Sequence, residues 1–304
     1  MKRIPIFTDE PFDLGGWHGK KLSDAFAKRG FEAVFISLKD CCFNFSQQSS
    51  AHSAIQLPLF LDNLPQTAFI RGIAGGSLQQ VILRLDFLHA LQLSGVKVYN
   101  SAKAIERTVD KAMTSFLLHQ QGIASPNTWV CESRAQALAI VQQEIQDKQK
   151  IVIKPLFGSQ GKGVRILEVA TPFPVPMQEH VDGVYYLQQF IESSQNSRWH
   201  DTRVYFINNK AVAAMKRFGQ TWVNNVANGG RCEPVPATGE VVELAVQAAK
   251  ILEMDYCGVD VITDAKGQHY VLEVNSIPAW QGLQSVVELD IAQAMVDDLL
   301  EKCI

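Results

Sequence analysis

Short apolar runs alternate with helical patterns over the first hundred residues, and this alternation restricts the possible folds more than any other feature of the chain. The strand-like runs cover 4–7, 32–38, 67–70 and 96–100, and the helical patterns cover 18–29 and 78–93. Because strands joined through helices usually pair in parallel, we expect an α/β lobe built on a parallel sheet. The polar stretch 41–54 has no useful period and is predicted to be a loop.

The rest of the chain groups its helices and strands instead of alternating them. A helical pattern runs from 101 to 121, ends at Gly122 and resumes after Ser133, where S-R-A-Q fits a capping box. Strands are expected at IVIK, YYLQQFI, DTRVYFI and KAVAAMKRF, and a helix at 240–253 precedes two final strands. The prediction is an α/β and α+β chain of three lobes, with boundaries at 1–100, 101–188 and 189–304.

Composition excludes several classes of function. The chain has 304 residues, is 47% hydrophobic and has a net charge of −3, so it can bury a large core but carries no field that would attract nucleic acid or an anionic membrane. The N-terminus lacks the apolar stretch of a signal peptide, and no later run approaches transmembrane length, so a cytoplasmic location is expected. The six cysteines are scattered without metal-site spacing and are interpreted as free thiols.

Two carboxylates stand out in the final hairpin, CGVDVITDAKGQHYVLEVN. If Ala265 and Gln268 close the turn, Asp260 lies directly across from Glu273, and Asn275 shares their face. Facing carboxylates repel one another and need a cation, and magnesium accepts a few protein oxygens while keeping positions for water and phosphate. From the hairpin alone, a solvated polar face on an edge hairpin explains the pattern about as well.

A glycine-rich loop follows the predicted strand IVIK in the segment IVIKPLFGSQGKGVRIL. Lys154 ends the strand, and Gly158, Gly161 and Gly163 follow it. Glycines let backbone amides approach an anion, and lysine supplies a point charge for phosphate. The spacing fits neither the Walker A motif nor G-x-G-x-x-G, and taken alone a mobile hairpin loop explains it equally well.

Several segments together resemble the ATP-grasp superfamily, and most closely its RimK-type α-L-glutamate ligases. In chain order they are VDKAMTSFLLHQQGIASPNTWV, IVIKPLFGSQGKGV, LQQFIE, DTRVYFINNKAVAAMKRFG, NNVANGG, GVDVI and LEVNSIPAWQGL. The similarity covers roughly residues 67–304 and extends more weakly over the first lobe. It implies ATP and Mg²⁺, or Mn²⁺, held between two α+β lobes. A separate N-terminal Rossmann-like lobe, the pre-ATP-grasp lobe, would help to bind a carboxylate substrate.

The resemblance also implies roles for individual residues. The implied nucleotide contacts are Lys111, Lys154, the phosphate loop Gly158, Ser159, Gln160, Gly161 and Gly163, the adenine hinge Gln189, Phe190 and Ile191, and Asp201 and Asn225. Arg203 and Arg217 would lie near the transferred phosphate. The implied metal ligands are Asp260, Glu273 and Asn275. Two positions depart from the family pattern. Gln189 stands where glutamate is usual, and Val223 stands where relatives often have arginine, which removes one phosphate contact.

The implied reaction is amide formation through an acyl phosphate, in which charge neutralisation matters more than an acid or base. The segment from Ile70 to Lys111 looks like the versions associated with tetrahydromethanopterin biosynthesis, so glutamate would be added to a pterin precursor; a peptide or another small carboxylate stays open. His18 and Arg71 are candidate substrate contacts, although loop polarity also explains them. Two alternatives remain, a nucleotide-binding regulatory protein and a small-molecule kinase. The family is often dimeric or tetrameric, so a homo-oligomer is expected.

Overall fold

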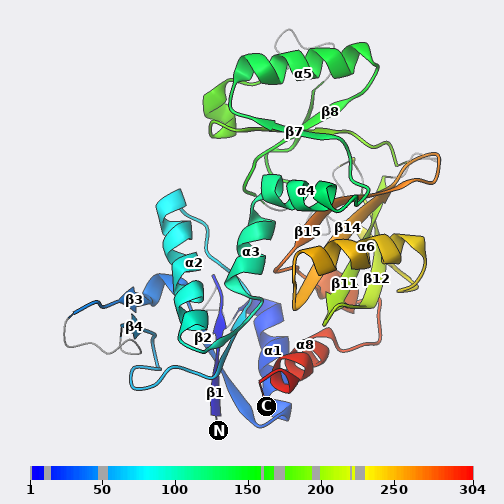
Figure 1. Cartoon of the computed structure of the whole chain (residues 1–304). Coiled ribbons are helices and arrows are strands. Elements are labelled where there is room, and N and C mark those ends of the chain that lie inside the picture. Colours follow the sequence, from blue (N-terminus) through cyan, green and yellow to red (C-terminus); the bar gives the residue numbers. More distant parts are fainter. Residues whose placement is uncertain are drawn as a thin grey trace.

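The computed structural model describes residues 2–9, 15–46, 54–158, 161–167, 175–193, 199–219, 221–222 and 230–303. Its strands form one parallel sheet and two larger antiparallel sheets, in addition to a small two-stranded pair. Figure 1 shows the helices packed around these sheets, with the parallel sheet at the N-terminal end of the chain. Within the described residues, no helix has the length and apolar character needed to cross a membrane.

The N-terminal sheet has the strand order β2-β1-β5-β6, with all strands parallel. Its elements are β1 (Lys2–Phe7), α1 (Gly16–Lys28), β2 (Phe31–Ile36), η2 (Leu38–Asp40), β5 (Thr67–Ile70), α2 (Leu78–Leu93) and β6 (Lys97–Tyr99). The predicted α/β lobe is therefore confirmed. The loop prediction for 41–54 is wrong at one end, because β3 (Cys42–Phe43) pairs with β4 (Ile55–Gln56). Phe43 stacks on Phe87 of α2 at 4.2 Å between ring centroids. This packing orders the strand but leaves no periodic pattern in the sequence. Residues 47–53 lie outside the described part.

The helix predicted at 101–121 is two helices, α3 (Ala102–Val109) and α4 (Lys111–Gln120). Asp110 separates them: its carboxylate accepts hydrogen bonds from the backbone N–H of Ala112 at 2.8 Å and of Met113 at 3.2 Å. Aspartate is a preferred N-cap, so it starts a new helix where hydrophobic spacing alone would continue the old one. The break fixes Lys111 in the first turn of α4.

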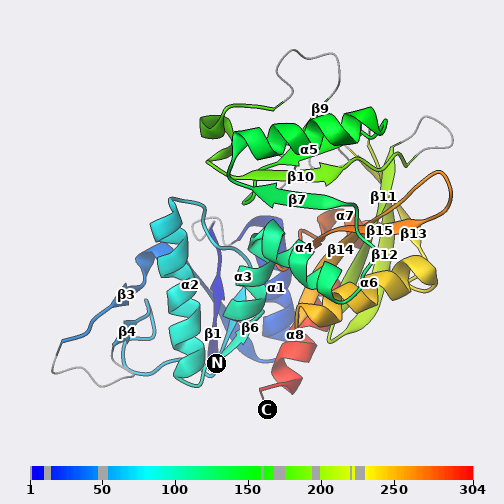
Figure 2. The same ribbon diagram turned by 45° about the horizontal axis from the view of Figure 1, so that its top comes forward.

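The central sheet is antiparallel, with the order β7-β10-β8-β9. It comprises β7 (Thr128–Cys131), α5 (Arg134–Gln146), β8 (Ile151–Lys154), β9 (Arg165–Leu167), η3 (Gln178–Val181) and β10 (Tyr185–Gln189). Ala137 and Val141 of α5 pack with Ile151 and Ile153 of the sheet in a hydrophobic core of their own. Figures 1 and 2 show α5 on the side of this sheet that faces away from the rest of the chain.

The C-terminal sheet is antiparallel, with the order β13-β12-β11-β14-β15. Its elements are β11 (His200–Ile207), β12 (Lys210–Phe218), β13 (Arg231–Val235), α6 (Glu240–Ile251), β14 (Tyr256–Thr263), β15 (His269–Asn275), α7 (Gln281–Gln284) and α8 (Ile291–Glu301). Val204, Val259 and Val261 belong to the core formed with α6. Because side chains alternate across a strand, Arg203 and Asp260 lie on the opposite face. One face of this sheet is thus apolar under α6. The other face carries Arg203 and Asp260 at one end and, further along β11, Tyr205 and Ile207 in the core shared with α8.

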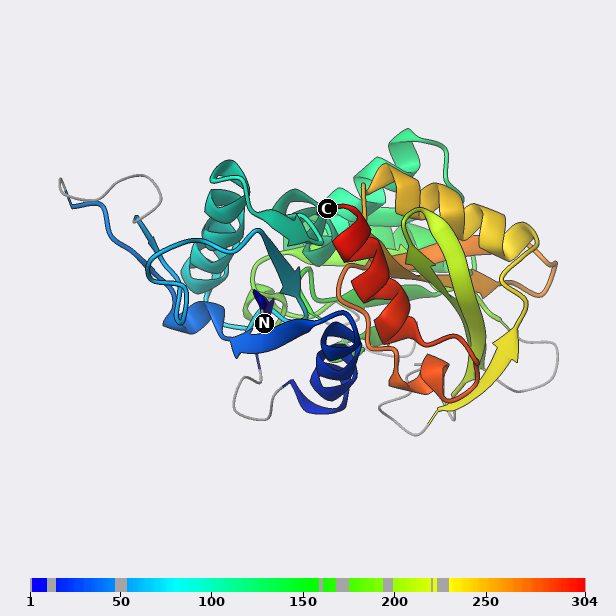
Figure 3. The same cartoon turned by 90° about the horizontal axis from the view of Figure 1, so that it is seen from below.

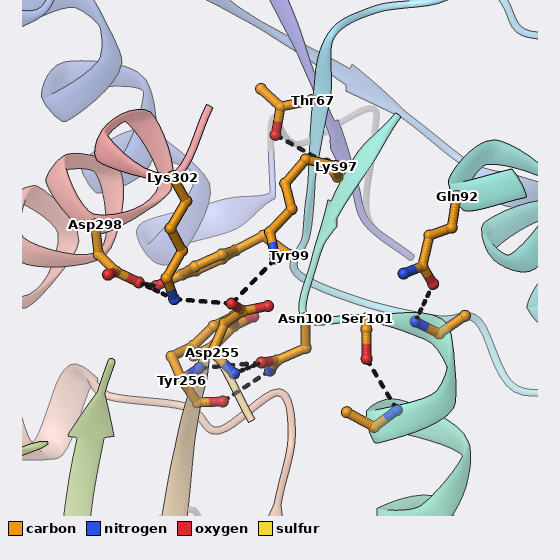
Figure 4. Close-up of polar contacts among 12 residues, drawn as sticks. Thr67, Gln92, Lys97, Tyr99, Asn100, Ser101, Asp255, Tyr256, Asp298 and Lys302 are labelled. Atoms are coloured by element: carbon orange, nitrogen blue, oxygen red, sulfur yellow. Dashed lines mark hydrogen bonds and ion pairs between the residues drawn. The ribbon is translucent and has the colours of Figure 1, made fainter. Parts of the chain in front are cut away.

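The chain end returns to the N-terminal lobe. Figure 3 shows α8 running beside α1, and Arg29, directly after α1, donates to Asp297 of α8 at 2.7 Å. At the junction after β6, the fully buried Asn100 forms four hydrogen bonds, and Figure 4 shows those with Asp255 and Tyr256. It donates to the carbonyl oxygens of Tyr256 at 2.7 Å and Ser276 at 2.6 Å, and accepts from the backbone N–H of Asp255 at 2.7 Å and Tyr256 at 3.0 Å. The parallel sheet and the C-terminal sheet are therefore joined through buried polar contacts.

Candidate functional site

The two strands of the final hairpin place Asp260 directly across from Glu273, which confirms the predicted pairing. The predicted turn is wrong by one residue. Asp264, not Ala265, closes it, because the Asp264 carboxylate accepts from the backbone N–H of Lys266 and Gln268, each at 2.8 Å. A β-bulge in the hairpin next to Asp260 shifts the register back, so the two carboxylates still face each other.

Both arginines of the expected site form ion pairs on the polar face of the sheet. Arg203 donates to both oxygens of Asp260, at 2.7 and 2.6 Å, and Arg217 donates to both oxygens of Asp201, at 2.7 and 2.8 Å. Arg217 also lies 2.8 Å from Asp260. The four side chains make one continuous ladder of alternating charge across β12, β11 and β14. Glu192 takes no part in this ladder and pairs with Lys150 at 2.6 Å.

The charge state of Asp260 follows from this ladder. Burial by itself would raise the pKa of Asp260, but the guanidinium groups of Arg203 and Arg217 more than offset burial and hold that pKa well below its usual value. Asp260 is therefore an ionised carboxylate in a buried setting. Its two oxygens already accept three charge-assisted contacts, and a carboxylate has further lone-pair positions.

Glu273 and Asn275 provide the other oxygen ligands expected for a metal. The amide nitrogen of Asn275 donates to Glu273 at 3.1 Å, so the two side chains lie together. Among the residues that the structure describes, no three acidic, histidine or cysteine side chains come together. Any cation here would have two carboxylates, an amide oxygen and little else from the protein. That donor set fits Mg²⁺, which keeps several positions for water and phosphate oxygens.

Two lysines approach the carboxylate face from other elements. Lys111 of α4 donates to the carbonyl oxygens of Leu156 at 3.3 Å and Gly158 at 2.8 Å, and Lys154 of β8 donates to the side chain of Gln188 at 2.6 Å. Burial lowers the pKa of both lysines, and the negative charge of Glu273 acts in the opposite direction on each. The two ammonium groups therefore share an electrostatic environment with Glu273, although the three residues come from three different elements.

The glycine loop begins directly after β8. Gly163 has a φ of +75°, and a side-chain Cβ at this position would come within 2.8 Å of a ring carbon of Pro155, so glycine is required here for two separate reasons. Gly158 accepts the hydrogen bond from Lys111, which attaches the loop to α4. Ser159 and Gln160 lie outside the described residues, as do Val223 and Asn225 in the later segment.

The hinge between the central and C-terminal sheets follows β10. The backbone N–H groups of Gln189 and Phe190 donate within the central lobe, to Asn127 and Lys150, each at 2.8 Å. Ile191, which follows directly, forms no backbone–backbone hydrogen bond with another described residue. The ring of Phe190 packs against Trp199 and Trp222, each at 5.7 Å between centroids.

The two candidate substrate residues of the first lobe come together in space. His18 of α1 and Arg71, the residue after β5, both contact Trp280: the His18 ring lies 4.4 Å from the indole centroid, and the Arg71 guanidinium carbon lies 5.2 Å from it. Trp280 was not singled out from the sequence. The available signal was its place in the segment LEVNSIPAWQGL, directly after the expected metal ligands.

The site as a whole combines four cationic side chains with two facing carboxylates at the meeting of two sheets. Lys111, Lys154, Arg203 and Arg217 supply the positive charge that a polyphosphate requires, and Asp260 and Glu273 supply oxygens for a divalent cation. Such an arrangement suits transfer of a phosphoryl group, where stabilisation of charge dominates the chemistry.

Comparison with known proteins supports this interpretation. Residues 108–299 match the model of the RimK-like ATP-grasp domain. The tetrahydromethanopterin:α-L-glutamate ligase of Methanococcus maripaludis is 34% identical over 237 residues, covering 77% of this chain and 78% of the relative. The enzyme of the same name from Methanocaldococcus jannaschii is 34% identical over 251 residues, covering 81% of each chain. The ATP-grasp ligase PsnB, solved with a precursor variant, Mg and ADP, has a TM-score of 0.71 at 18% identity, covering 100% of this chain and 99% of PsnB.

Proposed function

Because the chain belongs to the RimK-like ATP-grasp family, we propose that it is an ATP-dependent carboxylate–amine ligase that adds L-glutamate, or a similar amino acid, to a small carboxylate acceptor. One carboxylate oxygen of the acceptor attacks the γ-phosphate of ATP, giving an acyl phosphate and ADP. The amine then attacks the acyl carbon, phosphate leaves, and the amine loses a proton. The net reaction converts an acid, an amine and ATP into an amide, ADP and phosphate.

The observation that carries this proposal is the pairing of Asp260 with Glu273 opposite two lysines from other elements. Facing carboxylates on one sheet are costly unless cations lie beside both of them. Arg203 and Arg217 compensate the charge of Asp260, but no ion pair among the described residues includes Glu273. Lys154 is half-buried and donates to Gln188 at 2.6 Å, so it is not a solvated surface lysine. A site for a metal-bound polyphosphate accounts for both features together.

Each residue of the site has a role in this proposal. Lys111, Lys154 and the loop Gly158, Ser159, Gln160, Gly161 and Gly163 hold the phosphates, the hinge Gln189, Phe190 and Ile191 holds adenine, and Asp201 and Asn225 complete the nucleotide site. Arg203 and Arg217 stabilise the transferred phosphoryl group and the acyl phosphate. Asp260, Glu273 and Asn275 hold Mg²⁺, or Mn²⁺. The bound cation would neutralise charge that develops on the phosphate oxygens.

The relatives point to the class of acceptor. Two of them are named tetrahydromethanopterin:α-L-glutamate ligases and cover more than three quarters of this chain. We therefore propose a pterin-type acceptor that ends in a carboxylate, with L-glutamate as the amine. Assembly as a dimer or tetramer and a cytoplasmic location stay predictions; light scattering and cell fractionation would measure them.

Mass spectrometry of reaction mixtures tests the proposal. The protein is incubated with MgATP, L-glutamate and a panel of carboxylate acceptors that includes pterins with a terminal carboxylate. The expected product is an acceptor heavier by one glutamyl residue. A phosphorylated acceptor that persists in the presence of glutamate would instead indicate a kinase, and nucleotide binding without any product over the whole panel would indicate a regulatory protein.

A further inference from the structure

Arg71 lies at the boundary between the parallel sheet and the C-terminal sheet, where its backbone is fixed. Its N–H donates to the carbonyl oxygen of Phe7 in β1 at 2.7 Å, and the hydroxyl of Tyr256 donates to the carbonyl oxygen of the preceding Ile70 at 2.5 Å. The guanidinium is half-buried and lies over the indole ring of Trp280. Strands from two lobes therefore hold this arginine in place.

Two hydrogen-bond donors are unused at this point. The Nε–H of Arg71 and the Nε1–H of Trp280 are both buried, and neither has a hydrogen-bond partner among the residues that the structure describes. Trp280 is fully buried as a whole residue. A buried donor without a partner costs roughly 1–3 kcal/mol, and unpaired donors in native proteins are uncommon. Two of them on side chains in direct contact call for a shared explanation.

The positive charge of Arg71 also has no ion-pair partner in the described part of the chain. Among the ion pairs of the described residues, none includes Arg71, in contrast to the neighbouring site, where Arg203 and Arg217 each face a carboxylate. His18 also contacts Trp280, and its Nε2 accepts a hydrogen bond from the Trp280 backbone N–H at 3.2 Å. Burial and the charge of Arg71 lower the pKa of His18 to about 3, so His18 is neutral near pH 7. Arg71 is thus the charged member of this cluster, and it forms no ion pair with a described residue.

The position of this cluster connects it to the phosphoryl-transfer face. Trp280 follows Pro278, and Pro278 packs so closely over Gly258 that an added Cβ would lie 3.1 Å from the Pro278 side chain and 3.5 Å from the side chain of Arg203. Tyr205, two residues after Arg203 on β11, belongs to the same hydrophobic core as Trp280. Arg71 and Trp280 therefore lie beside the strand that carries Arg203.

We propose that Arg71 and Trp280 form a binding site for a carboxylate of a substrate that does not itself react. The inference rests on the proposed ligase function and adds a ligand class for a separate subsite. A carboxylate is acceptor-only and planar, so it can accept from the guanidinium and the indole N–H at once. The indole Nε1–H of Trp280 is buried in the structure. A carboxylate can therefore reach it only after a local shift of the 276–280 segment. The carboxylate comes either from the amino acid or from the acceptor.

Binding measured without turnover tests the site. The protein in MgADP is titrated by calorimetry with L-glutamate and, separately, with glutarate, a dicarboxylate that lacks the amine. The variants are Arg71→Lys, which keeps the charge and loses the Nε–H, and Trp280→Phe, which keeps a ring and loses the N–H. The matched control is Lys21→Ala, which removes another cation over a tryptophan of the same lobe, 5.8 Å from the Trp17 centroid.

Wild type and the Lys21→Ala control are expected to bind at least one of the two ligands, with affinity about tenfold weaker in both site variants, because a hydrogen bond to a charged group is worth roughly that factor. Binding of glutamate alone assigns the subsite to the amino acid, and binding of glutarate as well assigns it to the acceptor. Unchanged affinity in Arg71→Lys, or no binding of either ligand to wild type, overturns the proposal. ADP affinity checks that each variant is folded; if Trp280→Phe fails this check, Arg71→Lys decides.

The two proposals fail separately. If the variants bind the carboxylate more weakly but the wild type forms no amide, the subsite proposal is supported and the ligase proposal is rejected. If amide forms and both variants keep the substrate affinity of the wild type, the ligase proposal is supported and the subsite proposal is rejected. Arg71 would then only stack on Trp280 as a structural contact.

Discussion

Asp260 and Glu273 face each other on adjacent strands, yet their surroundings differ. Asp260 is buried between Arg203 and Arg217, whereas Glu273 is half-buried and contacts the Asn275 amide. The sequence was sufficient to predict that the two carboxylates oppose each other. It did not show that Asp260 is paired with two arginines, because cross-strand neighbours from β11 and β12 are set by tertiary pairing rather than by local spacing.

Substitution of the two carboxylates is expected to separate stability from metal binding. Asp260→Ala leaves Arg203 without its partner in a buried setting, so the free energy of unfolding should fall by about 3 kcal/mol or more. Glu273→Ala relieves a like-charge contact and should change the free energy of unfolding by less than about 1 kcal/mol. The same substitution should abolish magnesium binding and, with it, activity. Urea denaturation of both variants checks this; equal losses of stability would contradict the distinction.

Protonation of His18 is expected to make the fold sensitive to acid. The pKa of His18 is lowered to about 3 by burial and by Arg71, from 6.5 in an unfolded chain. Between these values the unfolded state binds a proton that the folded state does not, so the contribution of His18 is complete above pH 6.5 and is lost as the pH falls towards 3. His18→Gln, which can still accept from Trp280, should flatten the fall in melting temperature between pH 6.5 and 4. If the melting temperature of His18→Gln falls with pH as steeply as that of the wild type, the account is wrong. The control is His119→Gln, which replaces an exposed histidine and should keep the wild-type slope.

At the scale of elements, hydrophobic spacing predicted most helices and strands, and the exact bounds of β5, α2 and β12 agree with the segments read from the sequence. The differences have local causes. Asp110 caps a new helix inside one apolar pattern, and the Asp264 side chain lengthens the final turn by one residue. Asn100 was not singled out because a lone asparagine after a strand carries no pattern; its importance comes from partners about 155 and 176 residues away in sequence.

Removal of the Asn100 side chain is expected to loosen the connection between β6 and the strands that carry the site. Asn100→Ala leaves two backbone N–H groups and two carbonyl oxygens without this partner in a buried position, so the free energy of unfolding should fall by about 3–5 kcal/mol. Gln92→Ala is the matched control, since Gln92 accepts one backbone hydrogen bond, from Ala102 at 2.8 Å, and its loss should cost about 1 kcal/mol. Equal denaturation midpoints for Asn100→Ala and Gln92→Ala would refute the role assigned to this junction.

At the scale of the whole molecule, the three predicted lobes, 1–100, 101–188 and 189–304, remain a proposal, and contacts cross both boundaries. Helix α8 lies against α1, and Tyr99 donates to Asp298 at 2.6 Å, so the first and last lobes share a core. Ala104 of α3 and Leu118 of α4, although inside the predicted central lobe, pack in one core with α6 and the C-terminal sheet. The central sheet is linked to α4 through smaller contacts, which include Ser115 with Tyr186 at 2.8 Å and the hydrogen bond from Lys111 to Gly158. The central sheet is therefore the part most free to move against the rest of the structure.

Hydrogen exchange is expected to report this difference. Addition of MgADP should slow amide exchange in β8 and β10 more than in β1 and β5, because the nucleotide lies between the central and C-terminal sheets in the proposed function. Mass spectrometry of peptides after exchange measures both regions in one experiment. A slowing that is equal over the whole chain, or greater in β1 and β5, would contradict the proposed place of the nucleotide.

The most direct test of the central claim is phosphate release from MgATP, measured with the acceptor alone, with glutamate alone and with both. The account predicts release that requires both substrates and disappears in Glu273→Ala, which is expected to stay folded. Phosphate release that persists at the same rate in Glu273→Ala, or that needs neither substrate, would contradict a ligase site built on Asp260 and Glu273.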